Sequence, residues 1–157
     1  MSAHDIVNGW LAEIGSEVGT SLKLSPEGVC LLAFDEGIDV AVEVHDQGDI
    51  VHLHSQVCTV PGGTRRAALL EGALALNLFG QGTAGGTLGY DRETNTLVLY
   101  RGWRLDRLDS QAMADAIAAQ VIAVGEVRDR LVEAGAGVCD SCGEDHPPGP
   151  CEFHIRG

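Results

Sequence analysis

The stretch that decides the fold runs from Leu69 to Tyr90 and reads LLEGALALNLFGQGTAGGTLGY. Its leucines and alanines recur at helical spacing, which predicts an amphipathic helix that begins near Thr64, whose hydroxyl can cap the first turn. Gly80 ends this helix, because glycine takes the left-handed conformation at a helix end without steric cost. After a glycine-rich loop, residues Thr87–Tyr90 and Thr96–Arg101 read as the two strands of a hairpin.

The composition indicates one domain with a core of its own, since 45% of the 157 residues are apolar. Aromatic residues make up only 4%, so Leu, Val, Ile and Ala must build that core. The formal charge of −13 and the pI near 4.6 argue against nucleic acid and anionic membranes as partners, because binding to phosphates requires Lys and Arg. A cationic or apolar partner fits this charge better.

The N-terminus has neither the basic region nor the apolar run of a signal peptide. No apolar run reaches the roughly 20 residues that a membrane span requires. We therefore expect a cytoplasmic protein. The chain has 5 cysteines, and this odd number argues against a disulfide framework and for reduced thiols or metal ligands.

The remaining elements follow from apolar spacing. A first helix is predicted from about Asp5, which can cap it, to Glu17. Three strands are predicted next, at Gly28–Phe34, Ile38–Val44 and Ile50–Val60. A third helix opens at Asp109 or Ser110, and its predicted buried stripe comprises Met113, Ile117, Gln120, Val121, Val124, Val127 and Leu131. The order α-β-β-β-α-β-β-α predicts an α+β fold in which an antiparallel sheet packs against helices.

These elements together resemble the class I type III secretion chaperones, the CesT/SycE-like (Tir chaperone) family. The resemblance rests on the order and spacing of the helix ending Asn77-Leu78-Phe79, the glycine-rich loop, Leu88-Gly89-Tyr90-Asp91 and Leu97-Val98-Leu99. It implies a dimeric chaperone domain over residues 1–135 that is not an enzyme and requires no cofactor. Its partner would be the N-terminal segment of a secreted effector protein, kept competent for secretion without ATP.

The resemblance also implies two sets of contact residues. The second helix and the following hairpin form the two-fold homodimer interface in the family, and the matching positions are Leu70, Leu74, Leu78, Leu88, Tyr90, Leu97, Leu99 and Trp103. The candidate effector contacts on the first helix and the early strands are Trp10, Leu11, Leu31, Leu32, Phe34, Val40 and Val42. An extended peptide can add to a sheet edge and place alternate side chains in apolar pockets, which suits such a partner.

Motifs for catalysis are missing from the sequence. Residues Gly80–Gly85 match the dinucleotide pattern G-x-G-x-x-G, but a helix precedes them and a strand follows, the reverse of what phosphate binding at a helix N-terminus needs. We therefore interpret them as a connecting loop. The chain has no nucleophile elbow, P-loop or H-E-x-x-H motif. Cys30 and Cys58 lie in apolar strands, where cysteine usually acts as a small hydrophobe.

Two groups of residues suggest a metal. His52 and His54 lie two apart on one strand face, although a solvated face pointing outwards is the favoured interpretation. In the tail, residues 136–157, the set Cys139, Cys142, His146 and Cys151 has a spacing one residue shorter than a zinc knuckle, and His154 adds a fifth candidate. A mobile, thiol-bearing tail is favoured over a zinc site there.

The alternative functions are a small zinc protein, either a metal-dependent enzyme or an adaptor, and a generic protein-binding module with the same fold. We expect the core from Asp5 to Ala134 to keep its dimer and its partner-binding surface without the tail, because its helices and sheet carry their own apolar faces.

Overall fold

The computed structural model describes residues 1–45, 48–135 and 152–154. The helices are α1 (Ala3–Val18), α2 (Thr64–Asn77) and α3 (Ser110–Glu133), and the strands are β1 (Val29–Phe34), β2 (Ile38–Val44), β3 (Ile50–Thr59), β4 (Thr87–Asp91), β5 (Thr96–Arg104) and β6 (Glu152–His154). Up to α3 this is the predicted order, so the predicted α+β fold class is confirmed. Strand β6 is an addition that the sequence pattern did not indicate.

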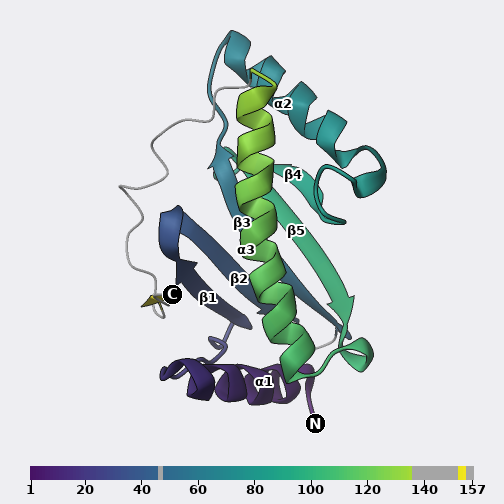
Figure 1. The fold of residues 1–157 in the computed structure, drawn as a ribbon. Coiled ribbons are helices and arrows are strands. Elements are labelled where there is room, and N and C mark those ends of the chain that lie inside the picture. Colours follow the sequence, from purple (N-terminus) through teal and green to yellow (C-terminus); the bar gives the residue numbers. More distant parts are fainter. Residues whose placement is uncertain (46–47, 136–151, 155–157) are drawn as a thin grey trace.

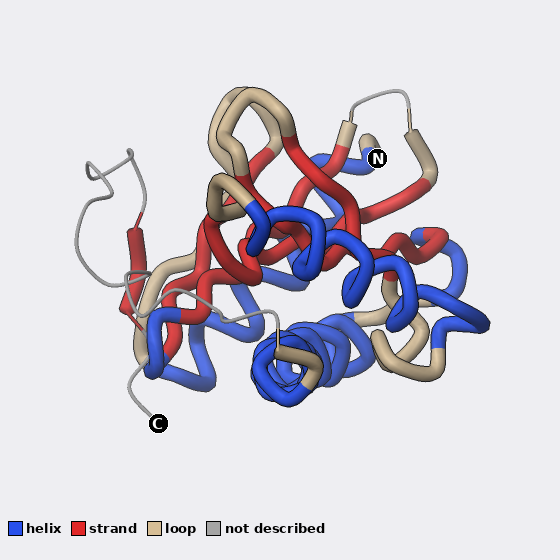
Figure 2. Tube along the Cα trace, turned by 90° about the horizontal axis from the view of Figure 1, so that it is seen from above, coloured by secondary structure: helices blue, strands red, loops and turns tan. Residues whose placement is uncertain are grey.

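The sheet has the strand order β4-β5-β3-β2-β1-β6. Its first five strands pair antiparallel, and β6 runs parallel to β1. Helix α3 crosses one face of the sheet, and α1 lies across one end of that face (Figure 1). A view down α3 shows the sheet on one side of this helix (Figure 2). In each strand, every second side chain points away from α3, to the other face of the sheet, which we call the open face.

The helix ends differ in detail from the predicted caps. Helix α1 begins one turn earlier than expected, because Ser2 is its N-cap and forms a capping box with Asp5. Asp109, one of the two residues predicted to open α3, is its N-cap, and its carboxylate accepts from the backbone N–H of Ala112, the third helical residue, at 2.8 Å. Helix α2 has Gly63 at its N-cap, so Thr64 is the first helical residue and makes no capping hydrogen bond.

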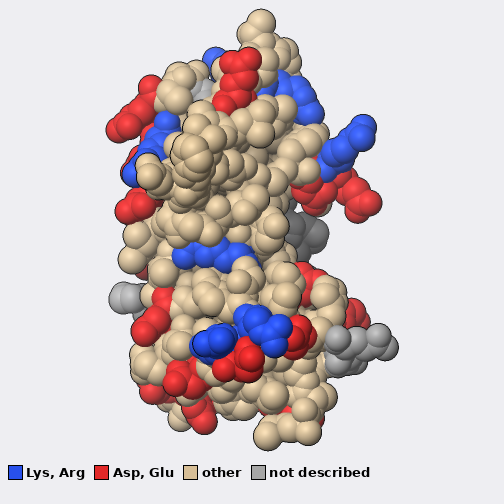
Figure 3. Space-filling model, turned by 90° about the vertical axis from the view of Figure 1, so that its right-hand side faces the viewer, with Lys and Arg blue, Asp and Glu red and all other residues tan. Residues whose placement is uncertain are grey.

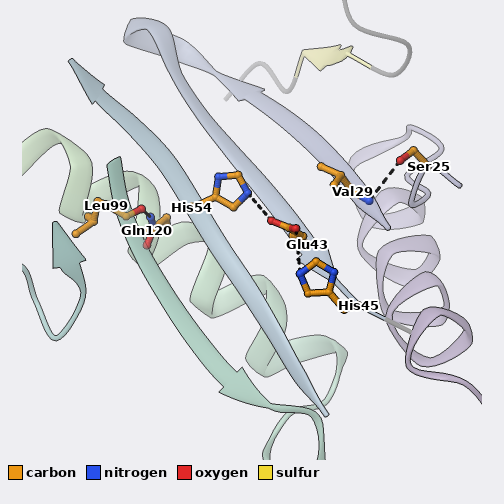
Figure 4. Close-up of polar contacts among 7 residues, drawn as sticks. All are labelled: Ser25, Val29, Glu43, His45, His54, Leu99 and Gln120. Atoms are coloured by element: carbon orange, nitrogen blue, oxygen red, sulfur yellow. Dashed lines mark hydrogen bonds and ion pairs between the residues drawn. The ribbon is translucent and has the colours of Figure 1, made fainter. Parts of the chain in front are cut away.

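Two clusters of buried side chains form the core. The first lies between α1, the first half of α3 and strands β1 to β3, and the second lies between α2, the β4–β5 hairpin and the second half of α3. The buried stripe predicted for α3 is confirmed over its whole length, from Met113 in the first cluster to Leu131 in the second, except that Val121 is half-buried. Gln120 lies between the clusters, where its Nε2 donates to the Leu99 carbonyl at 2.9 Å (Figure 4).

Arg128 ties α3 to two backbone segments. Its Nε donates to the carbonyl of Val57 at 2.8 Å, and Nη2 donates to those of Gly37 at 3.1 Å and Gln56 at 3.3 Å. Its Nη1 donates to the Glu36 carbonyl at 3.2 Å. One guanidinium group, with donors in a rigid fork, thus holds both the β1–β2 turn and β3 against the helix.

Candidate partner-binding surfaces

Three large apolar side chains at the end of α2 face the solvent. The exposed fractions are 70% for Leu74, 63% for Leu78 and 87% for Phe79, and we call these residues the α2 patch. Phe79 also has a φ of +58°, a backbone conformation that costs energy for a bulky residue. Scattered apolar residues are normal on a surface, but an adjacent set of this size is typical of an interaction site.

The α2 patch rests on a tightly built turn. The Asn77 amide donates to the Leu88 carbonyl at 2.9 Å and accepts from the Leu88 N–H at 2.8 Å, so one side chain pairs with β4 as a neighbouring strand would. At Gly82 a Cβ would lie 2.8 Å from the carbonyl oxygen of Leu76, so this position requires glycine. Residues Gly80–Gly85 therefore connect a helix to a strand, and the interpretation as a loop is confirmed.

The first turn of α2 is attached to the hairpin through a second group of residues. The Arg66 guanidinium lies 4.7 Å from the centroid of the Tyr90 ring, a cation–π contact. The Tyr90 hydroxyl donates to Asn95 at 2.9 Å, and the Asn95 amide donates to the Val60 carbonyl at 2.9 Å. Both ends of α2 are thus fixed, so the α2 patch is presented on a rigid support.

The predicted dimer-interface residues fall into three groups: exposed Leu74 and Leu78, half-buried Leu70, Tyr90 and Trp103, and buried Leu88, Leu97 and Leu99. The side chains of the last group pack in the second cluster of the protomer's own core. In the single protomer they support the surface from beneath, and their part in a dimer interface stays a prediction. Trp103 packs against the first cluster, away from the α2 patch. Phe79, the most exposed large apolar side chain here, was not among the predicted residues.

The predicted effector contacts divide in the same way: half-buried Trp10, Leu31 and Phe34, and buried Leu11, Leu32, Val40 and Val42. The buried four belong to the first cluster. Trp10 and Phe34 pack against the core with part of their surface exposed. Leu31 belongs to neither cluster and lies in register with Ala41 and, through it, with His54 on the open face.

A shallow groove of about 480 Å³ crosses the open face between β2 and β4. Glu43 lies at one side of it, with an oxygen 3.1 Å from His54 Nε2 and the other 3.3 Å from His45 Nε2 (Figure 4). His52 and His54 both line the groove, so the prediction that they point away from the core is confirmed. Within residues 1–45, 48–135 and 152–154, no group of three or more His, Cys, Asp or Glu residues is placed to hold a metal ion.

Charged side chains leave part of the surface near α2 uncovered. Figure 3 views the side that carries the end of α2 and the loop after it, and a broad area there has neither acidic nor basic side chains.

Elsewhere charges pair locally: Arg104 lies 3.1 Å from Asp106 and 2.8 Å from Asp49, and these contacts raise the pKa of its guanidinium. Burial lowers the pKa of Arg101, which reaches beneath the glycine-rich loop to the Thr83 carbonyl at 3.4 Å.

The predicted zinc ligands Cys139, Cys142, His146 and Cys151 lie outside the described residues, so the zinc site stays a prediction. Cys30 and Cys58 are buried in the core, as expected for small hydrophobes. Among the described helices, none combines the length and hydropathy that crossing a membrane requires.

Comparison with known proteins identifies relatives of this fold. The sequence profile of the Tir chaperone protein (CesT) family matches residues 9–128. No curated protein matches the sequence. The ExsC–ExsE complex is similar with a TM-score of 0.69 and 23% identity, over 90% of this chain and 100% of that chain. The HopA1–SchA chaperone–effector complex has a TM-score of 0.64 and 16% identity, over 81% and 96%. The heterodimeric ExoU–SpcU complex from the type III secretion system of Pseudomonas aeruginosa has a TM-score of 0.58 and 20% identity, over 79% and 96%.

Proposed function

The chain belongs to the Tir chaperone protein (CesT) family, and on that basis we propose that it is a type III secretion chaperone. It binds the N-terminal segment of a secreted effector protein and keeps that segment competent for secretion. The similar HopA1–SchA structure is a chaperone–effector complex, and the ExoU–SpcU complex comes from a type III secretion system. The proposal gives the protein a binding role in the cytoplasm, with no catalytic step.

The observation that carries the proposal is the α2 patch. Its three apolar side chains are exposed close together, and an exposed apolar set of this kind is typical of an interaction site, which supports a partner surface that covers them. A second copy of the chain suits this role, because a two-fold contact places the same patch against itself. In a protein with a formal charge of −13, such a self-contact is favourable where few charged side chains lie nearby, and the broad uncharged area near the end of α2 in Figure 3 suits it.

We propose the other end of the molecule for the effector contacts. Trp10, Leu31 and Phe34 offer half-buried apolar surface on α1 and β1, and an extended segment can reach both elements along one edge of the sheet. A segment held in this way stays unfolded without ATP, since only binding free energy is used.

The dimer is tested by light scattering on purified protein at micromolar concentration. Wild type should have twice the protomer mass, and Leu78→Asp should have the mass of one protomer while keeping its circular dichroism, because Leu78 is exposed at the patch. Ala118→Asp, at an exposed position of α3, is the matched control and should stay dimeric. A monomeric wild type would contradict the proposed homodimer.

The chaperone role is tested by co-expression with the secreted protein encoded by a neighbouring gene. We expect an ATP-independent complex in which limited proteolysis spares the partner's N-terminal segment. Leu31→Asp should weaken binding by about tenfold or more, as for one apolar contact at the centre of an interface. The proposal fails if that N-terminal segment is dispensable for the complex, or if binding depends on nucleotide.

A further inference from the structure

The outer edge of β1 is occupied by a segment from the far end of the same chain. The pairs are Leu31 with Glu152, Leu32 with Phe153, and Ala33 with His154, all in parallel orientation. Without β6, β1 would be the last strand on this side of the sheet (Figure 1). An edge strand presents unpaired N–H and C=O groups, which is what an incoming extended segment pairs with.

The contact between β6 and β1 is short. Three residue pairs hold β6, whereas β1 pairs with β2 along its whole length from Val29 to Phe34. Parallel pairing is slightly less stable per residue than antiparallel pairing. Residues 134–151 separate β6 from α3, so bringing it to the edge also costs loop-closure entropy. Such a strand can leave the edge without disturbing either core cluster.

We propose that Glu152–His154 is a built-in competitor for the β1 edge, and that a partner segment gains this edge by displacing it. The inference rests on the proposed function and adds a regulatory element to it. Strand β6 protects the edge from unwanted strand pairing while no partner is bound, and it lowers the affinity for segments that pair weakly.

The partner that fits this edge is an extended peptide with alternating apolar side chains. On the open face such side chains lie beside Val29, Leu31 and Ala33 of β1. Glu43 is in register with Val29 and Asp39 with Ala33, and both acidic residues lie on that face of β2, so basic side chains at the matching positions of the peptide are favoured. The net charge of −13 favours a basic segment for the same reason.

The expected size of the competition follows from the fraction of molecules whose edge is open. If the edge is open in one tenth to one third of molecules, the apparent affinity falls by about three- to tenfold, because only the open form binds. Removing the competitor should therefore strengthen binding by about the same factor.

The first measurement asks whether the contact forms in solution, using full-length protein. Phe153→Pro and His154→Pro each remove one backbone N–H and fix φ near a value unsuited to a strand. Because alternate residues of a strand face the same neighbour, one of the two variants removes a donor aimed at β1. Hydrogen exchange of the β1 amides that do not face β2 should become faster in that variant. Phe153→Ala keeps the N–H and is the matched control.

The second measurement asks whether the edge accepts a strand in trans. The probe is a fluorescent peptide with the sequence of residues 150–157, carrying serine in place of Cys151. Its affinity for the Phe153→Pro or His154→Pro protein should exceed its affinity for wild type by about three- to tenfold. The effector segment from the co-expression experiment should show the same ratio.

Unchanged β1 exchange in both proline variants would overturn the proposal, because the edge would then not be held by β6. Faster hydrogen exchange of β1 together with equal probe affinity for the variant and wild type would overturn it as well. In that case β6 would pair with β1 but would not compete with a partner segment for the edge. A failure of the effector to bind any variant would contradict the proposed function, while the probe would still decide the competition. The two failures are therefore distinguishable.

Discussion

The two edges of the sheet are closed by different means. At the β4 edge, the Asn77 side chain pairs with both backbone groups of Leu88, 11 residues further along the chain, at 2.9 and 2.8 Å. At the β1 edge, three residues of a distant segment form a short parallel ladder. Asn77 lies at the end of a helix that is itself packed into the core, whereas β6 is joined to the core by residues 134–151.

The difference indicates which edge is permanent and which is exchangeable. A local side-chain cap adds little loop-closure cost and is formed whenever α2 is folded. A strand from a distant part of the chain can dissociate and must then bind the β1 edge again, so competing segments change the fraction of time for which it occupies that edge. We therefore assign the β4 edge to the stable core with its α2 patch and the β1 edge to reversible binding.

The largest expected effect separates the core at β4 from the surface at β1. Leu88→Asp places a charge in the second cluster, where Leu88 is 6% exposed, and should lower the free energy of unfolding by roughly 3 kcal/mol or more. Leu31→Asp, at a half-buried position of the open face, should cost about 1 kcal/mol or less. Urea denaturation of both variants checks this, and equal losses would break the distinction between the two edges.

A smaller effect tests the side-chain cap itself. Asn77→Ala leaves the Leu88 N–H and C=O without their partner, which should lower the free energy of unfolding by about 1–3 kcal/mol. Gln81→Ala, at an exposed position of the next loop, is the control and should be near neutral. Phe153→Pro should cost less than Asn77→Ala in the same denaturation experiment. The reverse order would show that β6 stabilises the sheet more than the cap does.

A pH measurement sharpens the description of the β4 end. Hydrogen bonds from the Thr94 hydroxyl and the Glu93 N–H hold the pKa of the Asp91 carboxyl below its ordinary value of 3.8. Because the folded-state pKa is lowered, the carboxylate stabilises the fold at pH above 3.8, and this contribution is lost as pH falls through the folded-state pKa. Asp91→Asn should thus be less stable than wild type at neutral pH but not in strong acid. An NMR titration in which Asp91 has its ordinary pKa would contradict the turn geometry.

The smallest expected effect concerns the tail beyond α3. Chelation should leave the free energy of unfolding of the core unchanged within about 0.5 kcal/mol, because both clusters are built from apolar side chains. Metal analysis before and after chelation gives the zinc content. Release of about one zinc per chain, together with faster exchange at the β1 edge, would instead show that Cys139, Cys142, His146 and Cys151 bind metal and order the segment before β6.

The sequence alone predicts most of the secondary structure, because apolar spacing reports directly on helices and strands. Ile38–Val44 alternates cleanly and has the predicted bounds, and α3 begins at Ser110, one of the two predicted starting positions. Alternation does not reveal which buried positions are core and which are contacts, however. Leu97 and Leu99 are buried in the protomer's own core, whereas Leu78, a residue of the same type, is exposed.

The polar residues that fix the architecture left no periodic signal. Asn77 acts through the backbone of Leu88, 11 residues away, and Arg128 acts through the carbonyl of Val57, 71 residues away, so both roles depend on the tertiary structure. Strand β6 spans only Glu152–His154, which is too short for a period of two to be recognised. Phe79 looked like the last residue of a helix, and only its positive φ and its exposure mark it as part of a surface.

The two-cluster core places both tryptophans of the chain at one end. Trp10 and Trp103 pack against the first cluster, and Tyr90 packs against the second. Phe34 packs against both clusters. Indole fluorescence therefore monitors the α1 end of the molecule and is nearly blind to the α2 end. If the two ends unfold together, fluorescence and circular dichroism give coincident transitions. If the two ends unfold in separate transitions, tryptophan fluorescence reports the transition of the α1 end alone, without an added label.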